Sequence, residues 1–247
     1  MGILKSACLY DKYADIQNTA ARSLIEEAGA GGIARILEIG CGTGNYTRFL
    51  AEKFSEARVI AVDKSKKMVE IAKKKLAGKG IEFIVADAED LRPEGEFDLI
   101  TSNAALQWLK DFESTMLNYK NALAENGVIA FSMFGPATFW ELGHSLKAAL
   151  GNHVKIAAAD FLKKDEITMM MNRCFKAVTV KEKIVKETFN SLAELLNKIR
   201  HTGAWGDAVK NILLWKKDAF KKTEEKYRSN FGKIEVSYQV FFCRGIK

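Results

Sequence analysis

Short apolar runs alternate with amphipathic stretches through the middle of this chain, and that alternation limits the fold more than any other feature. Five runs have the length and the β-branched content of buried strands: 36–39, 58–63, 81–87, 97–101 and 128–131. Three other stretches repeat apolar residues with helical spacing: 46–54, 65–76 and 112–123. Strands that alternate with helices form βαβ units, so the pattern predicts an α/β fold whose parallel sheet has helices on both faces.

The rhythm changes on either side of this central segment. Residues 11–28 are expected to form an amphipathic helix before it. Beyond residue 135 the spacing predicts two helices and then two strands: 139–150, 165–173, 177–187 and 234–243. Residues 190–232, which have mostly helical spacing, separate the last two strands. We therefore expect one domain over 1–247, with a mainly parallel seven-stranded sheet and a helical cap over 190–232 inserted between the last two strands.

The composition excludes several classes of protein. With 247 residues, 48% of them apolar, and only two prolines, the chain is neither disordered nor a low-complexity repeat. No apolar run approaches the roughly 20 residues that cross a bilayer, and residues 1–30 lack the apolar block of a signal peptide. The four cysteines and three histidines show no paired metal-binding spacing. We therefore expect a cytoplasmic protein with reduced thiols and no metal.

The positive charge is confined to the C-terminal part of the chain. Residues 1–150 carry 18 Lys and Arg against 20 Asp and Glu, whereas residues 151–247 carry 20 against 11, a net charge of +9. Such a surface either solubilises the protein or docks an acidic partner. Nucleic-acid binding has only this charge in its favour, because the sequence has no recognisable RNA-binding module. The charge alone leaves solubility and docking open.

A glycine-rich segment follows the first predicted strand and precedes a predicted helix. Residues 38–44 read Glu-Ile-Gly-Cys-Gly-Thr-Gly. Gly40, Gly42 and Gly44 let the backbone turn tightly and approach a ligand, and the helix N-terminus offers free N–H groups. The spacing differs from the GxGxxG of dinucleotide-binding proteins, because the third glycine comes one residue early. Glu38 followed by GxGxG resembles the first motif of class I S-adenosylmethionine-dependent methyltransferases.

Acidic residues at the ends of the next two strands extend this resemblance. Asp63 ends the second strand, where a carboxylate can accept both ribose hydroxyls, and Asp87 ends the third, where a carboxylate can accept the exocyclic amine of adenine. Either residue could instead cap the helix that follows. Because ligands bind at this edge of parallel sheets, we predict that S-adenosylmethionine binds here and leaves as S-adenosylhomocysteine. Further cofactor contacts are expected from nearby residues: Cys41, Lys64, Met68, Ala88 and Asn103.

The end of the fourth strand indicates a narrower family. Residues 103–108 read Asn-Ala-Ala-Leu-Gln-Trp, without the Asn/Asp-Pro-Pro-aromatic motif of methyltransferases that act on adenine or glutamine amides. This hexapeptide, together with four other segments, resembles the malonyl-acyl-carrier-protein O-methyltransferases of biotin synthesis. Those segments are 10–17, 131–142, 192–203 and 236–240. The resemblance covers nearly the whole chain, although His201 and Thr202 replace a more apolar pair, and trans-aconitate methyltransferases share the hexapeptide.

The resemblance implies a Rossmann-like class I methyltransferase fold and a defined reaction. The enzyme would methylate the free carboxylate of a malonyl thioester on acyl carrier protein, which is an acidic partner, or on malonyl-coenzyme A, early in biotin synthesis. The alternative is a trans-aconitate-type carboxyl methyltransferase with a small-molecule acceptor, which needs no docking face. The basic C-terminal part favours the first reaction. We expect a monomer that binds neither nucleic acid nor membranes.

Methyl transfer to a carboxylate needs no general base, because the acceptor is already ionised at neutral pH. We therefore expect positioning groups in place of a catalytic base. Arg200 could hold the malonyl carboxylate through two hydrogen bonds, while Tyr10 and His144 could donate to the acyl group. Gln107 and Trp108, just after the fourth strand, are expected at the mouth of the cofactor pocket. For most of these residues a purely structural role remains open.

Overall fold

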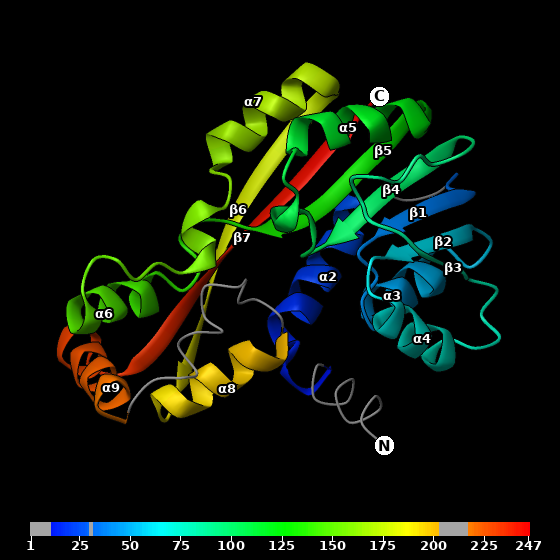
Figure 1. Ribbon diagram of the computed structural model, residues 1–247. Coiled ribbons are helices and arrows are strands. Elements are labelled where there is room, and N and C mark those ends of the chain that lie inside the picture. The colour runs from blue at the N-terminus through cyan, green and yellow to red at the C-terminus, as the bar shows by residue number, and fades with distance from the viewer. Residues whose placement is uncertain (1–10, 30–31, 203–216) are drawn as a thin grey trace. The chain divides into compact units, whose positions relative to one another are not determined.

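The computed structural model describes residues 11–29, 32–202 and 217–247 of the chain (Figure 1). Among these residues, seven strands form one sheet in the order β3-β2-β1-β4-β5-β7-β6. The strands are β1 (Arg35–Ile39), β2 (Arg58–Asp63), β3 (Glu82–Val85), β4 (Phe97–Asn103), β5 (Leu123–Phe134), β6 (Lys176–Phe189) and β7 (Ile234–Ile246). This order confirms the predicted α/β fold with a mainly parallel seven-stranded sheet.

The helices fall largely where the apolar spacing predicts them. In the described ranges the α-helices are α2 (Asp15–Glu27), α3 (Asn45–Lys53), α4 (Lys66–Lys75), α5 (Phe112–Ala122), α6 (Trp140–Leu150), α7 (Lys164–Cys174), α8 (Leu192–Thr202) and α9 (Lys217–Phe231), with the short 3-10 helices η1 (Leu106–Trp108) and η2 (Ala157–Asp160). None of the helices in the described part of the chain is long and apolar enough to cross a membrane.

The chain divides into two compact units. The first comprises residues 1–133, 164–182 and 241–247, and the second comprises residues 134–163 and 183–240. The helices α8 and α9 lie between β6 and β7 in the chain, within the predicted insertion. That the insertion caps a ligand site, and that the chain acts as a single domain, stay predictions.

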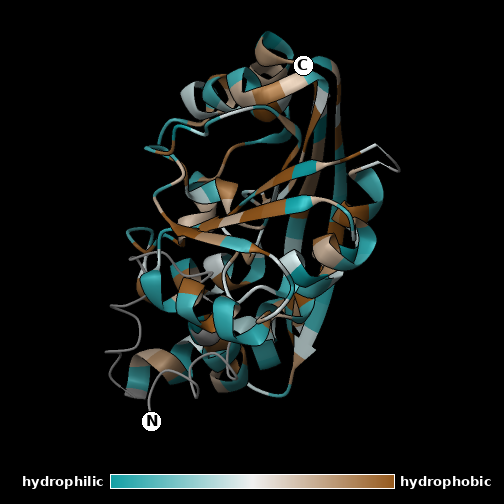
Figure 2. Ribbon diagram, turned by 90° about the vertical axis from the view of Figure 1, so that its right-hand side faces the viewer, coloured by the Kyte–Doolittle hydropathy of each residue, from teal (hydrophilic) through white to brown (hydrophobic). Residues whose placement is uncertain are grey.

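The first unit contains the parallel strands β1 to β4. β1 pairs with β2 on one side and with β4 on the other, so Ile39 lies opposite both Val62 and Ser102. The strands read as near-continuous apolar runs because both faces of such a sheet are covered, and Leu37 and Ile100 are buried. The helix α4 packs against β2 and β3, and α3 packs against β2. In Figure 2 the central strands are mainly brown, whereas the helices carry both colours.

The strand β5 is longer than the sequence predicts. The predicted strand covered 128–131, but β5 begins directly after α5 and runs over Leu123–Phe134. Pairing with β4 is irregular here, because Phe97 lies opposite Leu123 whereas Leu99 lies opposite Val128. Within this bulge Asn126 takes a φ of +63°. The exposed polar residues of the bulge conceal the early start of the strand in the sequence.

The second unit is held together by α6 and α9, which pack against each other (Figure 1). The ring of Phe231, at the end of α9, lies edge-on to Trp140 at a centroid distance of 5.3 Å and to His144 at 5.9 Å. The hydroxyl of Tyr227 donates to the carbonyl oxygen of Glu235 at 2.6 Å, which ties α9 to the start of β7. Aromatic contacts therefore fix α9 on α6, and the Tyr227 hydroxyl fixes it on β7.

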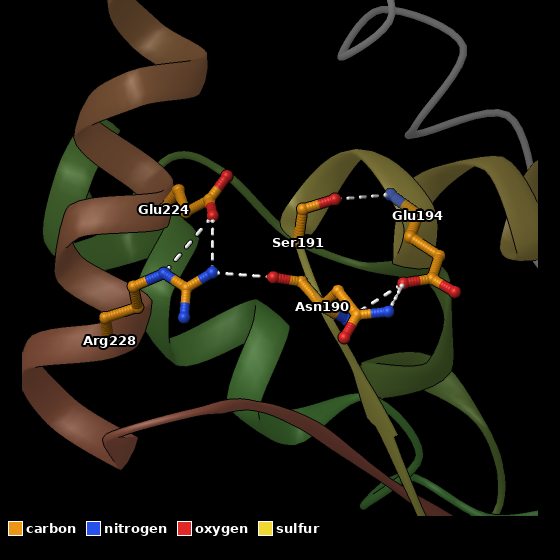
Figure 3. A network of polar contacts seen from close by, with 5 residues as sticks. All are labelled: Asn190, Ser191, Glu194, Glu224 and Arg228. Carbon is orange, nitrogen blue, oxygen red and sulfur yellow. Dashed lines mark hydrogen bonds and ion pairs between the residues drawn. The ribbon is translucent and has the colours of Figure 1, made fainter.

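A second set of polar contacts joins α9 to the start of α8 (Figure 3). Arg228 donates to the carbonyl oxygen of Asn190 at 2.8 Å and pairs with Glu224 on its own helix at 2.9 Å. The backbone N–H of Glu194 donates to the hydroxyl of Ser191, and the Glu194 carboxylate accepts from the N–H of Asn190. The Ser191 hydroxyl thus satisfies one N–H of the first turn of α8, Glu194 fixes the residue before it, and Arg228 joins this segment to α9.

Glu141 is a buried acid that joins α6 to β7. Only 3% of this residue is exposed, and its two carboxylate oxygens accept from the backbone N–H of Ser237 at 2.9 Å and from the Ser237 hydroxyl at 2.6 Å. We predict that Glu141→Ala lowers the free energy of unfolding by roughly 2–4 kcal/mol, because it leaves a buried strand N–H without an acceptor. Urea unfolding measures this, with the exposed Glu125→Ala as a control. A cost equal to that of the control would contradict a structural role for Glu141.

Candidate functional site

The loop between β1 and α3 follows a path that glycine takes without strain. The backbone N–H groups of Gly40 and Cys41 both donate to the carbonyl oxygen of Val62, at 2.7 and 2.9 Å. Gly40 has a φ of +74°, and a Cβ added there would lie 2.4 Å from the Cβ of Ala105. Gly42 has a φ of +53°, and an added Cβ would meet nothing within 4 Å. The loop is therefore packed at Gly40 and open at Gly42, where a ligand can approach the backbone.

Asp63, at the end of β2, is bound to this loop. Its Oδ2 accepts from the backbone N–H of Gly42 at 2.9 Å, and its Oδ1 accepts from the N–H of Ser65 at 2.8 Å. The N-cap of α4 is Ser65, whose hydroxyl accepts from the N–H of Met68. The alternative that Asp63 caps this helix is therefore wrong. Each carboxylate oxygen retains a lone pair with which it can accept a ribose hydroxyl.

Asp87 lies two residues beyond the end of β3. Its Oδ1 accepts from the backbone N–H of Glu89 at 3.1 Å, which stabilises a turn, and no helix begins at this point. The next residue, Ala88, is fixed by the buried hydroxyl of Tyr119, which donates to its carbonyl oxygen at 2.8 Å. The alternative of a helix cap is thus wrong for Asp87 too, and Oδ2 has no hydrogen bond from the residues that the structure describes.

Glu38, the acid before the glycines, is buried under the loop with 1% of its surface exposed. Burial raises the pKa of its carboxyl group to about 8, and the nearby Asp63 carboxylate adds to the rise. The Oε2 of Glu38 has no hydrogen-bond partner within the described ranges. A cationic ligand group bound beside it would supply the missing donor. This unsatisfied atom therefore fits the ammonium end of an amino-acid-like cofactor such as S-adenosylmethionine.

A small pocket lies between this loop and the start of α2. It encloses about 30 Å³, and its lining includes Ala14, Gln17, Gly42, Thr43 and Asn103. Its place beside the glycine loop suits one end of S-adenosylmethionine. The carboxylates of the neighbouring strand ends would then face the remainder.

Asp11 ties the segment before α2 to the glycine loop, a contact that the sequence analysis missed. Its Oδ1 accepts from the Thr43 hydroxyl at 2.6 Å and from the Asn45 amide at 2.9 Å, and its Oδ2 pairs with Lys75 at 2.8 Å. The helix predicted over 11–28 is interrupted at Ala14, and α2 begins one residue later. The interruption separates the turn that carries Asp11 from the helix that lines the pocket.

A second contact fixes α2 from the opposite side of the pocket. The side-chain amide of Asn103, at the end of β4, donates to the carbonyl oxygen of Gln17 at 3.0 Å. The amide oxygen of Asn103 accepts from the Ser132 hydroxyl at 2.7 Å, and the N–H of Ala104 donates to the carbonyl oxygen of Ser132 at 2.9 Å. Asn103, predicted as a cofactor contact, thus lines the pocket and positions α2 over it.

Comparisons with known proteins match this chain to methyltransferases. The methyltransferase domain family matches residues 36–127. A malonyl-[acyl-carrier protein] O-methyltransferase 1 of Ilyobacter polytropus is 35% identical over 92% of this chain and 85% of its own length. A malonyl-[acyl-carrier protein] O-methyltransferase of Acetivibrio thermocellus is 30% identical over 100% of this chain and 92% of its own.

The chain belongs to the malonyl-[acyl-carrier protein] O-methyltransferase family. Its class is therefore that of the S-adenosylmethionine-dependent methyltransferases, which confirms the predicted enzyme class and cofactor. Solved structures support the fold alone. The YcgJ protein of Bacillus subtilis has a TM-score of 0.65 at 19% identity, with 93% of this chain and 98% of that chain covered. Phosphoethanolamine N-methyltransferase 2 of Haemonchus contortus has a TM-score of 0.62 at 18% identity, with 98% and 56% covered.

Two residues predicted to bind substrate follow β4 in the first unit. Gln107 is buried, and its side-chain amide donates to the carbonyl oxygen of Ala104 at 2.8 Å. The amide oxygen of Gln107 has no hydrogen-bond partner in the described part of the chain. Trp108 is 38% exposed, so it is not a core residue. A buried acceptor without a partner thus lies beside an exposed indole, and their contact with substrate stays a prediction.

The other predicted substrate residues lie elsewhere. Tyr10 is outside the described residues. His144 on α6 and Arg200 on α8 are both exposed and belong to the second unit. Within the described part of that unit, no hydrogen bond, ion pair or ring contact joins these two residues. Their roles toward the substrate stay predictions.

The remaining predicted cofactor contacts differ in exposure. Cys41 is buried and lines the pocket, and burial raises the pKa of its thiol, so it is no nucleophile at neutral pH. Gly44, with a φ of +83°, is the N-cap of α3, and a Cβ added there would lie 2.9 Å from Cδ1 of Leu76. Lys64 is exposed and Met68 half-buried. Contact of Lys64 and Met68 with the cofactor stays a prediction.

The raised pKa of Glu38 predicts a stability that falls as pH rises. Between the ordinary pKa of 4.5 and about 8, the folded protein keeps the proton that the unfolded chain releases. From pH 5 to pH 8 the wild-type protein, without cofactor, should therefore lose roughly 2–5 kcal/mol of unfolding free energy relative to Glu38→Gln. Urea unfolding at three pH values measures this difference, with the exposed Glu52→Gln as a control. Parallel pH profiles for the wild type and Glu38→Gln would contradict the assignment.

Proposed function

We propose that this protein transfers a methyl group from S-adenosylmethionine to the free carboxylate of a malonyl thioester on acyl carrier protein, an early step of biotin synthesis. The observation that carries the proposal is the similarity to malonyl-[acyl-carrier protein] O-methyltransferases, which extends over nearly the whole chain. A cofactor motif alone would be shared with methyltransferases of many substrates. The similarity also covers the segments outside that motif, where acceptor specificity is expected to reside.

The reaction requires the chain to align S-adenosylmethionine with the malonyl carboxylate. When bound, S-adenosylmethionine supplies an electrophilic methyl group on a sulfonium, and one carboxylate oxygen of the malonyl group takes it while the carbon–sulfur bond breaks. The malonyl carboxylate has an ordinary pKa near 4 and needs no base. The chain's own contribution is alignment and the exclusion of water, and alignment can be worth roughly 7–11 kcal/mol.

The cofactor end of this site uses groups that are already oriented. Asp63 is held by two backbone N–H groups and would accept the ribose hydroxyls, and Asp87 would accept the adenine amine. The open backbone at Gly42 and the buried Glu38 would face the methionyl end. Arg200 would hold the malonyl carboxylate, and Tyr10 and His144 would donate hydrogen bonds to the acyl group along its arm, with Gln107 and Trp108 beside the cofactor. This assignment goes beyond the family match and defines the residues to test.

The carrier protein is the proposed partner because the positive charge is concentrated in the C-terminal part of the chain, where residues 151–247 carry a net charge of +9. Acyl carrier proteins are acidic, and complementary charge speeds encounter. Six lysines of this C-terminal part fall within residues 210–226: Lys210, Lys216, Lys217, Lys221, Lys222 and Lys226. Of these, Lys210 and Lys216 lie outside the described residues, and Lys221 lies 3.8 Å from Glu225 on the same helix. Malonyl-coenzyme A is an alternative thioester. We propose that the enzyme works as a monomer in the cytoplasm.

One experiment tests the acceptor directly. Purified protein and labelled S-adenosylmethionine are incubated side by side with malonyl carrier protein, malonyl-coenzyme A and trans-aconitate. The proposal expects label on the malonyl thioesters and none on trans-aconitate. The hexapeptide at 103–108, which is shared with trans-aconitate methyltransferases, is the reason to include the third acceptor. Label on trans-aconitate alone would overturn the proposal in favour of a small-molecule carboxyl methyltransferase.

Asp63→Ala is predicted to weaken S-adenosylmethionine binding by about 10–100-fold. The substitution removes charge-assisted hydrogen bonds worth roughly 1.5–3 kcal/mol. It also releases the N–H of Gly42, so Asp63→Asn, which keeps an acceptor for that N–H, should bind better than the alanine variant. Titration calorimetry on folded variants measures both affinities. Unchanged affinity in Asp63→Ala would remove Asp63 from the cofactor site.

Lys222→Glu combined with Lys226→Glu is predicted to lower kcat/KM for malonyl carrier protein by about tenfold at low salt. Both lysines are exposed on α9, one turn apart. The variant replaces a pair of positive charges four residues apart with a pair of negative charges, so the stability of α9 should change little. The kcat/KM for malonyl-coenzyme A, which presents no protein surface, is the control and should change far less. Equal losses with both substrates, or no loss with the carrier, would exclude this face as the docking site.

A further inference from the structure

The second unit contains a pocket of its own, formed entirely by residues of that unit. It encloses about 250 Å³ between α6 and the segment that leads into η2. On α6 it is lined by Trp140, His144 and Lys147, on the facing segment by Lys155 and Ile156, and in η2 by Ala159. Small-molecule sites usually enclose roughly 300–1,000 Å³. This pocket is therefore large enough for part of a ligand.

The pocket has a rigid apolar side. Ile156 is buried and packs closely on α6, because a Cβ added at Gly143 would lie 3.2 Å from its Cδ1. Trp140 is 48% exposed, yet its ring is fixed edge-on to Phe231, which also contacts the ring of His144. An indole that is held in place and still exposed offers contact area to a ligand at little cost in side-chain entropy.

The rim of the pocket is cationic. Lys147 is exposed and has no ion-pair partner among the residues that the structure describes. Lys155 pairs with Asp160, so much of its charge is offset. Lys147, one turn beyond His144 on the same helix, is thus the cation available to a ligand. The pocket combines an apolar side with an unneutralised positive charge, which matches an anion attached to a compact apolar group.

We propose that this pocket binds the phosphate and the adjoining dimethyl group of a 4′-phosphopantetheine arm. In that arm a phosphate ester is separated by a single methylene from a carbon that bears two methyl groups. The phosphate would lie at Lys147, and the methyl groups would pack against Trp140 and Ile156. The proposal rests on the proposed function, because the malonyl group is carried on such an arm both by carrier protein and by coenzyme A.

Ligand-observed NMR titration, which measures weak dissociation constants, tests the pocket without turnover. The probes are pantetheine 4′-phosphate, pantetheine and inorganic phosphate. We expect pantetheine 4′-phosphate to bind about tenfold more tightly than either of the others. Lys147→Ala should weaken its binding by about tenfold and leave pantetheine unaffected. The control Lys183→Ala removes an exposed lysine of the same unit that does not line the pocket, and it should bind like the wild type.

Ala159→Leu tests the apolar side, because it fills the pocket without changing charge. It should weaken the binding of both pantetheine and its phosphate. The proposal is overturned if Lys147→Ala and Ala159→Leu bind pantetheine 4′-phosphate like the wild type, or if inorganic phosphate binds as tightly as the ester. Methyl transfer to malonyl carrier protein is scored separately. If the wild type methylates malonyl carrier protein but Lys147→Ala does not change the binding of pantetheine 4′-phosphate, only the pocket proposal is overturned. If pantetheine 4′-phosphate binds as expected but no methyl transfer occurs, only the proposed function is overturned.

Discussion

The bond between the Asp63 carboxylate and the backbone N–H of Gly42 is the interaction on which the site depends. It ties the end of β2 to the middle of the glycine loop at 2.9 Å, while Gly40 and Cys41 donate to Val62 on the same strand. A parallel sheet places these strand ends at one edge, but only such bonds fix the shape of the loop between them. The loop then sets the start of α3, and Ser65, held by the same carboxylate, sets the start of α4.

This arrangement suits an enzyme that aligns its partners and has no group that must titrate during the reaction. Burial raises the pKa values of Glu38, Cys41 and Tyr46 around the loop, so these groups are mainly neutral at pH 7. Asp63, whose two oxygens are held by backbone N–H groups, is left as the acceptor for a ligand. A site organised before the ligand arrives loses little free energy to reorganisation. Methyl transfer to an ionised carboxylate requires no more than this.

The sequence was sufficient for the sheet, the glycine loop and the strand-end acids, because each follows from a local pattern. Apolar runs predict the buried strands, and glycine spacing predicts the loop between β1 and α3. The start of β5 could not be predicted, because the bulge around Asn126 is polar and resembles a turn. The Asp11 contacts could not be predicted either, because they join residues 32 to 64 positions apart. Such contacts depend on how α2 packs, which no local pattern encodes.

A crystal structure of the protein with S-adenosylhomocysteine tests the central claim, that the chain itself preorganises a cofactor site at this sheet edge. The account predicts ribose hydroxyls within about 2.6–3.2 Å of the Asp63 carboxylate, with that carboxylate still bound to the N–H of Gly42. It also predicts the adenine amine at Asp87 and the methionyl end against the glycine loop. A ribose bound away from Asp63, or a loop rebuilt on binding so that the Gly42 bond is lost, would contradict it.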